Sequence, residues 1–441
     1  TNRIEICCVV LKILAYKGHR DELQYIYCSR YVGYIEGHFK YILIRDPELV
    51  KAITVKNFDQ FVNRRQFLPE DDPLFGSSLV MMQGDKWRDM RTTLSPAFTG
   101  SKMRHMISLI DNFCFFFHPS DHLSEVFDVG DLMRKYSNDV IATTAFGLQV
   151  NSFKDVNNEF YKTGQSLFKT TLLRTLKFIM FLKLGIRMFF DDEIVMFFKN
   201  LVSSTIEYRT ANNVTRPDMI QLLIDASKGD LTAQVFIFFV AGFESVASTL
   251  TMCIHQLAIN PEPQEKLYQE IRDFKEKYRE VTYENILELK YLDCVLNESM
   301  RCFSPAIVLD RVCLKEFELP PSSDGAKPLT LKPGDPIFIP VNSFHWDPKN
   351  FPEPEKFNPD RFSDENKENI KPFTFMPFGA GPRNCVGSRF ALLELKVLLY
   401  NLVLNNKIVK CEQTSEPIRL KATGFNMKAR GGSFVKFEVR E

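Results

Sequence analysis

The stretch "FMPFGAGPRNCVGSRFALLELK", Phe375–Lys396, holds one cysteine in a short loop and then turns abruptly into a helix-like run. Three glycines and two prolines surround Cys385, and residues with high helix propensity follow. A thiolate, unlike a thiol, is a metal ligand and a nucleophile. The unpaired N–H groups and the positive dipole end of a helix N-terminus favour the thiolate. The stretch therefore predicts a cysteine that is presented for chemistry.

The residues around Cys385 narrow that chemistry. Gly379, Gly381 and Gly387 carry no side chains, so a flat group can approach the backbone closely. Arg383 can pair with an anion on that group. A cysteine protease needs a histidine partner, and none of the seven histidines lies in a recognisable motif. The competing interpretation is a structural cysteine in a tight turn.

Composition places the chain among globular proteins. Of its 441 residues, 45% are hydrophobic, which is enough to bury a large core. The 56 basic and 55 acidic residues give a net charge of +1, so no global field favours nucleic acid. The ten cysteines show no zinc-finger spacing, and their scatter is typical of thiols in a reducing compartment.

Pattern along the chain predicts a mainly α fold with a smaller β region (α+β). Residues 30–45 alternate like a β-hairpin. Residues 128–147 read as a capped amphipathic helix, and residues 230–262 as one long buried helix. After Arg311 the sequence becomes rich in proline and short strands. No linker separates independent parts, so residues 1–441 are predicted to form a single domain, with 1–20 a truncated or irregular N-terminus.

The segment "FGAGPRNCVG", Phe378–Gly387, resembles the haem-binding signature of the cytochrome P-450 family, with six residues at the family's positions. The resemblance implies haem b (iron protoporphyrin IX) as cofactor and Cys385 as the ligand of its iron. It implies further that Phe378 and Arg383 contribute to haem binding, Arg383 through a haem propionate.

Other motifs follow in the family's chain order. "ESMR", Glu298 to Arg301, matches the ExxR motif, and Arg361 of "PDRF" is expected to complete a structural charge network. "WRDMR" matches the WxxxR element, which places Trp87 and Arg91 on one helix face. By the same resemblance Trp87, Arg91, Arg311 and Arg64 are expected to meet the haem propionates.

The long helix carries "AGFES", where the family has a small residue, Gly, any residue, an acid and Thr. The resemblance implies that Glu244 and Ser245 are catalytic and relay protons to dioxygen. Ser245 stands in place of the usual threonine, so it keeps the hydroxyl but lacks the methyl group that restricts its rotamer.

The stretches "KWRDMRTTLSPAFTGSKMR" and "NDVIATTAFG" resemble the insect microsomal detoxification branch, related to vertebrate drug-metabolising members. This implies an oxidoreductase of xenobiotic metabolism on the cytosolic face of the endoplasmic reticulum membrane. It also implies O2 and lipophilic small molecules as substrates. The expected substrate-facing residues are apolar: Leu79, Val80, Ile237, Val240, Ala241, Ile307 and Val308.

Two partners are expected besides the substrates. The chain lacks a GxGxxG element, so electrons must come from a separate protein, by resemblance the NADPH–haemoprotein reductase. A basic patch for it is expected from Lys86, Arg88, Lys371 and Lys396, and the alternative is that these are simply solvated surface cations. The segment Leu176–Phe190 is either an ordinary amphipathic helix or one that dips into a membrane surface.

Two other functions stay open at the level of sequence. A haem-thiolate isomerase or dehydratase would need neither dioxygen nor a reductase, although the Glu244–Ser245 pair argues against it. A non-catalytic haem-binding remnant is suggested by the lack of the usual N-terminal membrane anchor and by the short stretch between Arg216 and Asp230.

Overall fold

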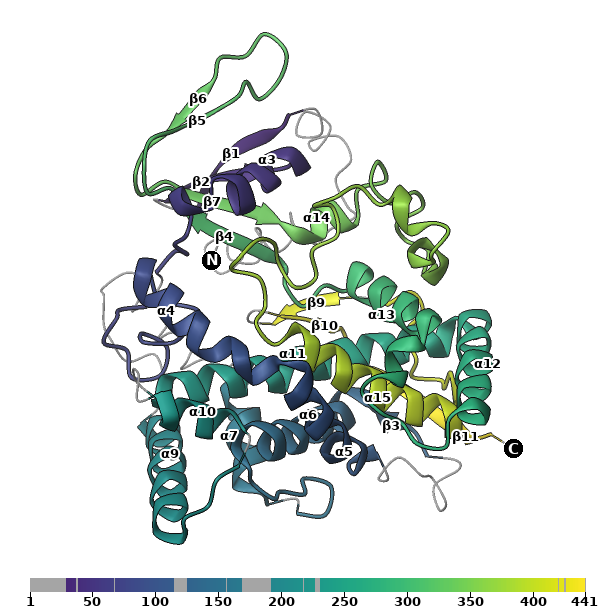
Figure 1. Ribbon diagram of the computed structural model, residues 1–441. Coiled ribbons are helices and arrows are strands. Elements are labelled where there is room, and N and C mark those ends of the chain that lie inside the picture. The colour runs from purple at the N-terminus through teal and green to yellow at the C-terminus, as the bar shows by residue number, and fades with distance from the viewer. Residues whose placement is uncertain are drawn as a thin grey trace. The chain divides into compact units, whose positions relative to one another are not determined.

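A computed structural model of the chain is shown in Figure 1. It describes residues 29–36, 39–66, 68–114, 125–155, 157–168, 192–216, 218–226, 231–418, 420–423 and 426–440. The predictions for 1–20 and for Leu176–Phe190 lie outside the described residues. The chain forms two compact units that interleave along the sequence: unit 1 draws on 1–65, 293–385 and 425–427, and unit 2 on 66–292, 386–424 and 428–441. The single domain stays a prediction.

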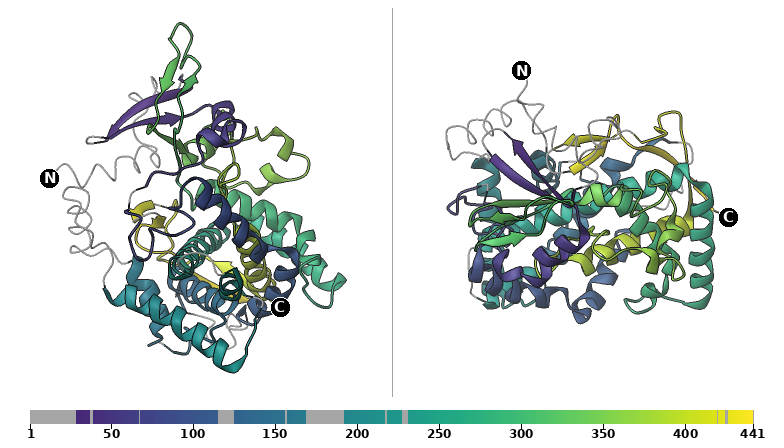
Figure 2. Two further views of the ribbon diagram at one scale, coloured as in Figure 1. Left: turned by 60° about the vertical axis from the view of Figure 1, so that its left-hand side comes forward. Right: turned by 90° about the horizontal axis from the view of Figure 1, so that it is seen from above.

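Unit 1 is built on a four-stranded sheet in the order β1-β2-β7-β4. The predicted hairpin is confirmed, since β1 (Tyr31–Glu36) pairs antiparallel with β2 (Phe39–Ile44). Strand β2 then runs parallel to β7 (Pro336–Pro340), which pairs antiparallel with β4 (Val308–Val312). The two views of Figure 2 show the purple hairpin beside the green strands, so segments about 300 residues apart form one sheet.

Short elements complete unit 1. These are α3 (Pro47–Lys51), the π-helix η2 (Ala52–Lys56), the 3-10 helix η3 (Phe58–Gln60), most of α13 (Lys290–Cys302), the paired strands β5 (Phe317–Leu319) and β6 (Leu329–Leu331), α14 (Val341–His345), and the 3-10 helices η7 (Pro359–Phe362) and η8 (Lys367–Asn369). The strands and proline-rich loops predicted after Arg311 are therefore confirmed.

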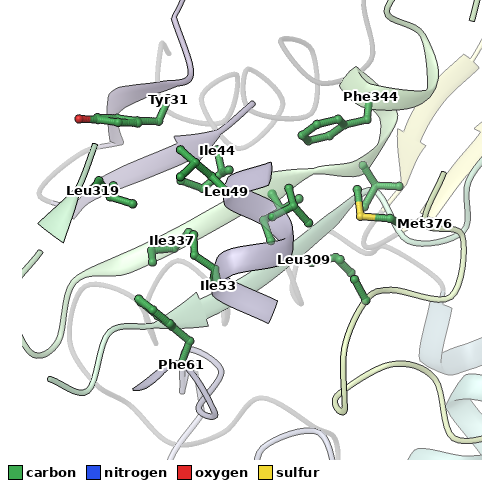
Figure 3. Close-up of a cluster of buried hydrophobic side chains, with 14 of the residues drawn as sticks. Tyr31, Ile44, Leu49, Ile53, Phe61, Leu309, Leu319, Ile337, Phe344 and Met376 are labelled. Atoms are coloured by element: carbon green, nitrogen blue, oxygen red, sulfur yellow. The ribbon is translucent and has the colours of Figure 1, made fainter. Parts of the chain in front are cut away.

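The hydrophobic core of unit 1 includes the start of the cysteine loop. Figure 3 shows side chains of the sheet and α3 meeting in one cluster, with Met376 at its edge. Met376 is 3% exposed and Ala380 is 7% exposed, and both belong to the cluster. Burial of these two residues fixes the loop to the sheet before it reaches Cys385.

Unit 2 is mainly helical. Its helices are α4 (Gly84–Leu94), η4 (Ser95–Phe98), α5 (Gly100–Asp111), α6 (Val129–Phe146), α7 (Glu159–Phe168), α9 (Asp192–Asn212), α10 (Met219–Ala226), α11 (Leu231–Ile259), α12 (Pro261–Lys277), η6 (Asn285–Glu288) and α15 (Ser388–Asn405). Strands β3 (Phe127–Asp128), β11 (Phe434–Val439) and β8 (Asn406–Val409) form one small sheet, and β9 (Leu420–Thr423) pairs with β10 (Asn426–Ala429). The mainly α fold with a smaller β region is confirmed.

Helix α6 begins and ends where the sequence predicts. The Asp128 side chain accepts hydrogen bonds from the N–H groups of Gly130 and Asp131, which caps the first turn. Gly147 ends the helix in the left-handed conformation with φ 71°, which glycine adopts without strain.

The long helix α11 is the core of unit 2, as predicted. It packs against α6, α9, α10, α12 and α15. Aromatic rings gather on it, with Phe198 edge-on to Phe236 at 5.0 Å and Phe160 edge-on to Phe239 at 4.9 Å. A Cβ atom on Gly242 would lie 2.7 Å from Ile141 of α6, so the glycine permits this close approach of the two helices.

Candidate functional site

The cysteine loop of unit 1 is closed by backbone hydrogen bonds. The Cys385 N–H donates to the carbonyl of Phe378 at 2.8 Å, and the Gly379 N–H donates to that of Met376 at 3.0 Å. Among the described cysteines, Cys385 is the one whose side chain is exposed. Helix α15 begins at Ser388, close behind it in the sequence. The loop therefore presents a thiol instead of burying it.

The three glycines of the loop serve different purposes. Gly379 and Gly381 have φ values of 82° and 71°, which favour glycine. A Cβ atom on Gly381 would lie 1.9 Å from the carbonyl oxygen of Thr54 in η2, so no side chain fits there. A Cβ atom on Gly387 would make an ordinary 3.5 Å contact with Phe98. The idea that all three clear space for a flat group is thus too simple, because Gly381 serves packing against η2.

Arg311 is a buried cation beside the loop. It is 1% exposed, and it donates to the carbonyls of Asp310 at 2.7 Å and Ala380 at 3.2 Å. Its buried Nε atom has no acceptor in the described chain. Burial, and then the nearby charge of Arg64, lower the pKa of Arg311 to about 10. An anionic ligand would relieve both effects.

Arg64 and Arg383 add charge at the same place. Arg64 donates to the carbonyl of Arg383 at 3.3 Å and lies 3.9 Å from the carboxylate of Asp310. Arg383 is 3% exposed. The guanidinium groups of Arg311 and Arg64 thus both donate to carbonyl oxygens of the loop or its neighbours, where a carboxylate would bind more strongly. This donor set fits the two propionates of haem, next to a cysteine that can ligate its iron.

The charge network predicted from ExxR and PDRF is confirmed. Arg301 donates to both carboxylate oxygens of Glu298, at 2.7 and 2.9 Å, and both side chains are 0% exposed. The Nε atom of Arg361 lies 3.4 Å from the same carboxylate. Arg301 also donates to the carbonyls of His345 at 3.0 Å and Pro354 at 2.8 Å. The network therefore joins α13 to the loops that follow β7.

His345 is a supporting residue that the sequence reasoning missed. Its Nε2 atom accepts a hydrogen bond from the Met376 N–H at 3.0 Å, at the start of the cysteine loop. Burial, and then the charge of Arg301, lower the pKa of His345 to about 3, so it is neutral at physiological pH. In the sequence, His345 stands directly before "WDP", and no local pattern marks it as a functional residue.

Unit 2 carries the other predicted site residues. Trp87 is 5% exposed on α4, and Arg91 lies one turn further along the same helix face with partial exposure. Two other basic residues of this helix are an exposed Lys86, 4.0 Å from Glu70, and a partly exposed Arg88, 3.4 Å from Asp85.

The small-residue segment of α11 forms a partly open stripe on a buried helix. Ala241 is exposed and Ser245 is partly exposed, one turn apart. The Ser245 hydroxyl donates to the Ala241 carbonyl, and the Thr249 hydroxyl donates to the Ser245 carbonyl at 2.8 Å. Glu244 is 2% exposed. Consecutive residues point about 100° apart on a helix, so Glu244 and Ser245 lie on different faces.

One expectation for the basic patch is wrong. Lys396 is 3% exposed and its ammonium group donates to the carbonyl of Ile286 at 3.4 Å. Helix α15 is buried on most sides, which turns Lys396 inward. Lys371 is exposed.

Each unit brings together its own part of the predicted site. Unit 1 holds Cys385, Arg383, Arg311, Arg64 and Phe378. Unit 2 holds Trp87, Arg91, Glu244 and Ser245. Of the expected substrate-facing residues, Leu79 and Ile237 are 7% and 8% exposed in unit 2, and Ile307 is 5% exposed in unit 1. Their roles toward a cofactor or substrate remain predictions.

Comparison with known proteins places these features in one family. The family model described as "Cytochrome P450" matches residues 22–435. The chain is 41% identical to "Probable cytochrome P450 9f2" of Drosophila melanogaster, over 93% of this chain and 87% of that protein. It is 38% identical to "Cytochrome P450 9e2" of Blattella germanica, over 93% and 86%. It is 34% identical to "Probable cytochrome P450 6a13" of Drosophila melanogaster, over 94% and 86%.

Proposed function

Since the chain belongs to the cytochrome P-450 family and is a haem-dependent monooxygenase, we propose that it oxidises neutral, lipophilic small molecules, xenobiotics among them, with electrons from a separate NADPH–haemoprotein reductase. Membership of the family implies haem iron as cofactor, and the use of dioxygen, a redox partner and hydrophobic substrates. The haem b form, the reductase and the substrate class are the proposed parts.

The loop of unit 1 supports Cys385 as the ligand of haem. Its thiol is exposed at the end of a loop that is fixed by the buried core and by His345. When bound, thiolate-ligated haem supplies the activation of dioxygen from which one oxygen atom enters the substrate. Arg311, Arg64 and Arg383 would hold the propionates, since the buried guanidinium of Arg311 bonds to carbonyls and keeps an unused donor. Trp87 and Arg91 are proposed to add donors from α4.

The observation that carries the substrate class is the apolar character of the α11 residues that precede Glu244 and of the segment before α4. Ile237, Val240 and Ala241 come from this helix, and Leu79 and Val80 from the segment before α4. None of these five side chains is charged or polar. Binding would come from burial of apolar surface, at about 25 cal/mol per Å². We therefore propose neutral ligands without a fixed anchoring charge.

Proton delivery is proposed to run through Ser245 more than through Glu244. The Ser245 hydroxyl lies on the partly exposed side of α11, where it donates to the Ala241 carbonyl. This hydroxyl can rotate away from that carbonyl and present its proton elsewhere. Glu244 is buried on another face of α11, and we propose that it acts only indirectly, through the turn of the helix that carries Ser245.

The proposed location is the cytosolic face of the endoplasmic reticulum membrane, with contact to the membrane surface. In the described part of the chain, α11 is the one helix long and apolar enough to cross a membrane, and 61% of its most apolar window is buried. Its packing against five other helices identifies it as a core helix. Binding to the membrane would therefore use another part of the chain.

The test measures turnover of a lipophilic compound that shifts the ferric Soret band. Product should require NADPH and the reductase together, whereas an isomerase or dehydratase would turn over without them. Ser245→Ala should keep its haem and form less product per NADPH consumed, and Ser245→Thr should match or exceed the parent. If Ser245→Ala couples as well as the parent, the hydroxyl does not deliver the proton.

A further inference from the structure

A buried glutamine on α11 holds the segment before α4 with both ends of its side-chain amide. Gln234 is 0% exposed. Its Oε1 atom accepts from the Leu79 N–H at 3.0 Å, and its Nε2 atom donates to the Ser77 carbonyl at 2.5 Å. Both partners are more than 150 residues away in the chain. The amide therefore replaces the backbone partners that this segment would have in a regular element.

The segment that Gln234 holds is itself well defined. The Asp72 carboxylate accepts from the N–H groups of Leu74 at 3.1 Å and Phe75 at 2.7 Å. A Cβ atom on Gly76 would lie 2.2 Å from the carbonyl oxygen of Glu70, so the backbone passes there without room for a side chain. A second contact with α11 lies next to the amide, because Phe75 packs edge-on to Phe236 at 5.2 Å.

Gln234 lies on the same side of α11 as the partly open stripe. At 100° per residue, Ala241 lies about 20° from Gln234 on one side and Ser245 about 20° on the other. Seven residues at 1.5 Å each place Ala241 about 10 Å further along the helix axis. The hydrogen bond to Leu79 therefore fixes this apolar residue at the head of the stripe that carries Ala241 and Ser245.

We propose that Gln234 is a positioning residue that determines substrate selectivity. By fixing Leu79 and Val80 against α11, it sets the apolar wall at the head of the stripe, and this wall discriminates substrates by size. Gln234 itself is buried and bonded to the backbone, so it acts through the segment and touches no substrate. The proposal rests on the proposed function, in which lipophilic compounds bind over this stripe.

Unit 2 offers a matched control. Gln264 is 2% exposed, and its amide bridges a distant backbone in the same way, donating to the Ile408 carbonyl at 2.8 Å and accepting from the Ile408 N–H at 2.8 Å. Gln264→Leu removes an equivalent bridge from α12, which is far along the chain from the segment before α4 (residues 69–82). The variant Gln234→Glu keeps an acceptor for Leu79 and loses the donor to Ser77, so it serves if Gln234→Leu folds poorly.

The first readout is amide hydrogen exchange of the 74–82 peptide in the purified holoprotein without substrate. Loss of the buried acceptor should speed exchange about tenfold in Gln234→Leu, and less in Gln234→Glu. Gln264→Leu should leave this peptide unchanged. The positioning role is overturned if the exchange rate of this peptide is unchanged in Gln234→Leu, or if it rises equally in Gln264→Leu. Neither outcome depends on any substrate.

The second readout is the ferric Soret shift with n-alkylbenzenes from toluene to hexylbenzene. The ratio of dissociation constants across the series should change at least about fivefold in Gln234→Leu, the effect of one lost hydrogen bond, and stay at the parent value in Gln264→Leu. A uniform change in all dissociation constants would overturn the selective role. If the parent binds no member of the series, the proposed function fails, and the selective role fails with it, while the exchange result still decides the positioning role.

Discussion

Replacement of Arg301 by alanine tests whether the ExxR network is structural. The guanidinium donates to both oxygens of Glu298 and to the carbonyls of His345 and Pro354, and it is 0% exposed. Without it, the buried Glu298 carboxylate keeps Arg361 at 3.4 Å and the Asn358 N–H at 2.9 Å. Removal of one partner of a buried ion pair costs roughly 3–5 kcal/mol, because the other charge stays buried.

That cost translates into a shift of the thermal unfolding midpoint. With about 2.1 cal/mol/K per residue, the 441-residue chain has an unfolding entropy of about 0.9 kcal/mol/K. Arg301→Ala should therefore lower the midpoint by about 3–5 °C, and by more if unit 1 unfolds separately. Haem content on purification should fall too, because Arg301 and His345 support the start of the cysteine loop.

The control is a pair of similar spacing on the surface. Arg272 is 49% exposed and lies 3.9 Å from Glu276 on α12. Arg272→Ala should cost at most about 0.5 kcal/mol and shift the midpoint by less than about 1 °C. If Arg301→Ala yields no folded protein, Arg301→Lys keeps the charge with fewer donors and should show an intermediate loss. An Arg301→Ala protein that melts and retains haem like Arg272→Ala would refute the reasoning.

Two further predictions concern the support of the loop. His345 stays neutral when folded because its pKa is about 3, whereas the unfolded chain gains a proton below about 6.5. Its stabilisation is therefore complete above pH 6.5 and is lost as the pH falls, so between pH 7.0 and 5.5 the parent should lose about 1 kcal/mol more unfolding free energy than His345→Gln. This would be contradicted if urea titrations showed that the parent and His345→Gln lose the same unfolding free energy between the two pH values. Gly381→Ala should yield far less haem-containing protein than Gly379→Ala, because its Cβ atom would lie 1.9 Å from the Thr54 carbonyl oxygen against a nearest contact of 3.5 Å at Gly379. Equal haem content in the two variants would show that the Thr54 contact is not limiting.

Local sequence patterns predicted those features whose causes lie within one segment. The cap and the left-handed terminus of α6 follow from Asp128 and Gly147, and the hairpin of β1 and β2 from alternation. The cysteine loop could be predicted as a functional site because its residue types are those that present one thiolate. Arg361 could be paired with Glu298 only through the family's pattern, since 63 residues separate them.

Features that depend on distant contacts could not be predicted. Lys396 is polar by type, yet α15 is surrounded in unit 2 and the side chain reaches the Ile286 carbonyl. Gly242 belongs to the AGFES motif, but its packing against Ile141 of α6 depends on a residue about 100 positions earlier. Gln234 carries no local signal, because its role follows from Ser77 and Leu79. No pattern within a dozen residues encodes such pairings.

Thiolate ligation of haem by Cys385 is the central claim, and one spectrum tests it most directly. The reduced, carbon-monoxide-bound parent should show the red-shifted Soret band of thiolate-ligated haem. Cys385→His should lose that band, and Cys411→Ser, at a partly exposed cysteine elsewhere, should keep it. A red-shifted band that survives in Cys385→His would contradict the account.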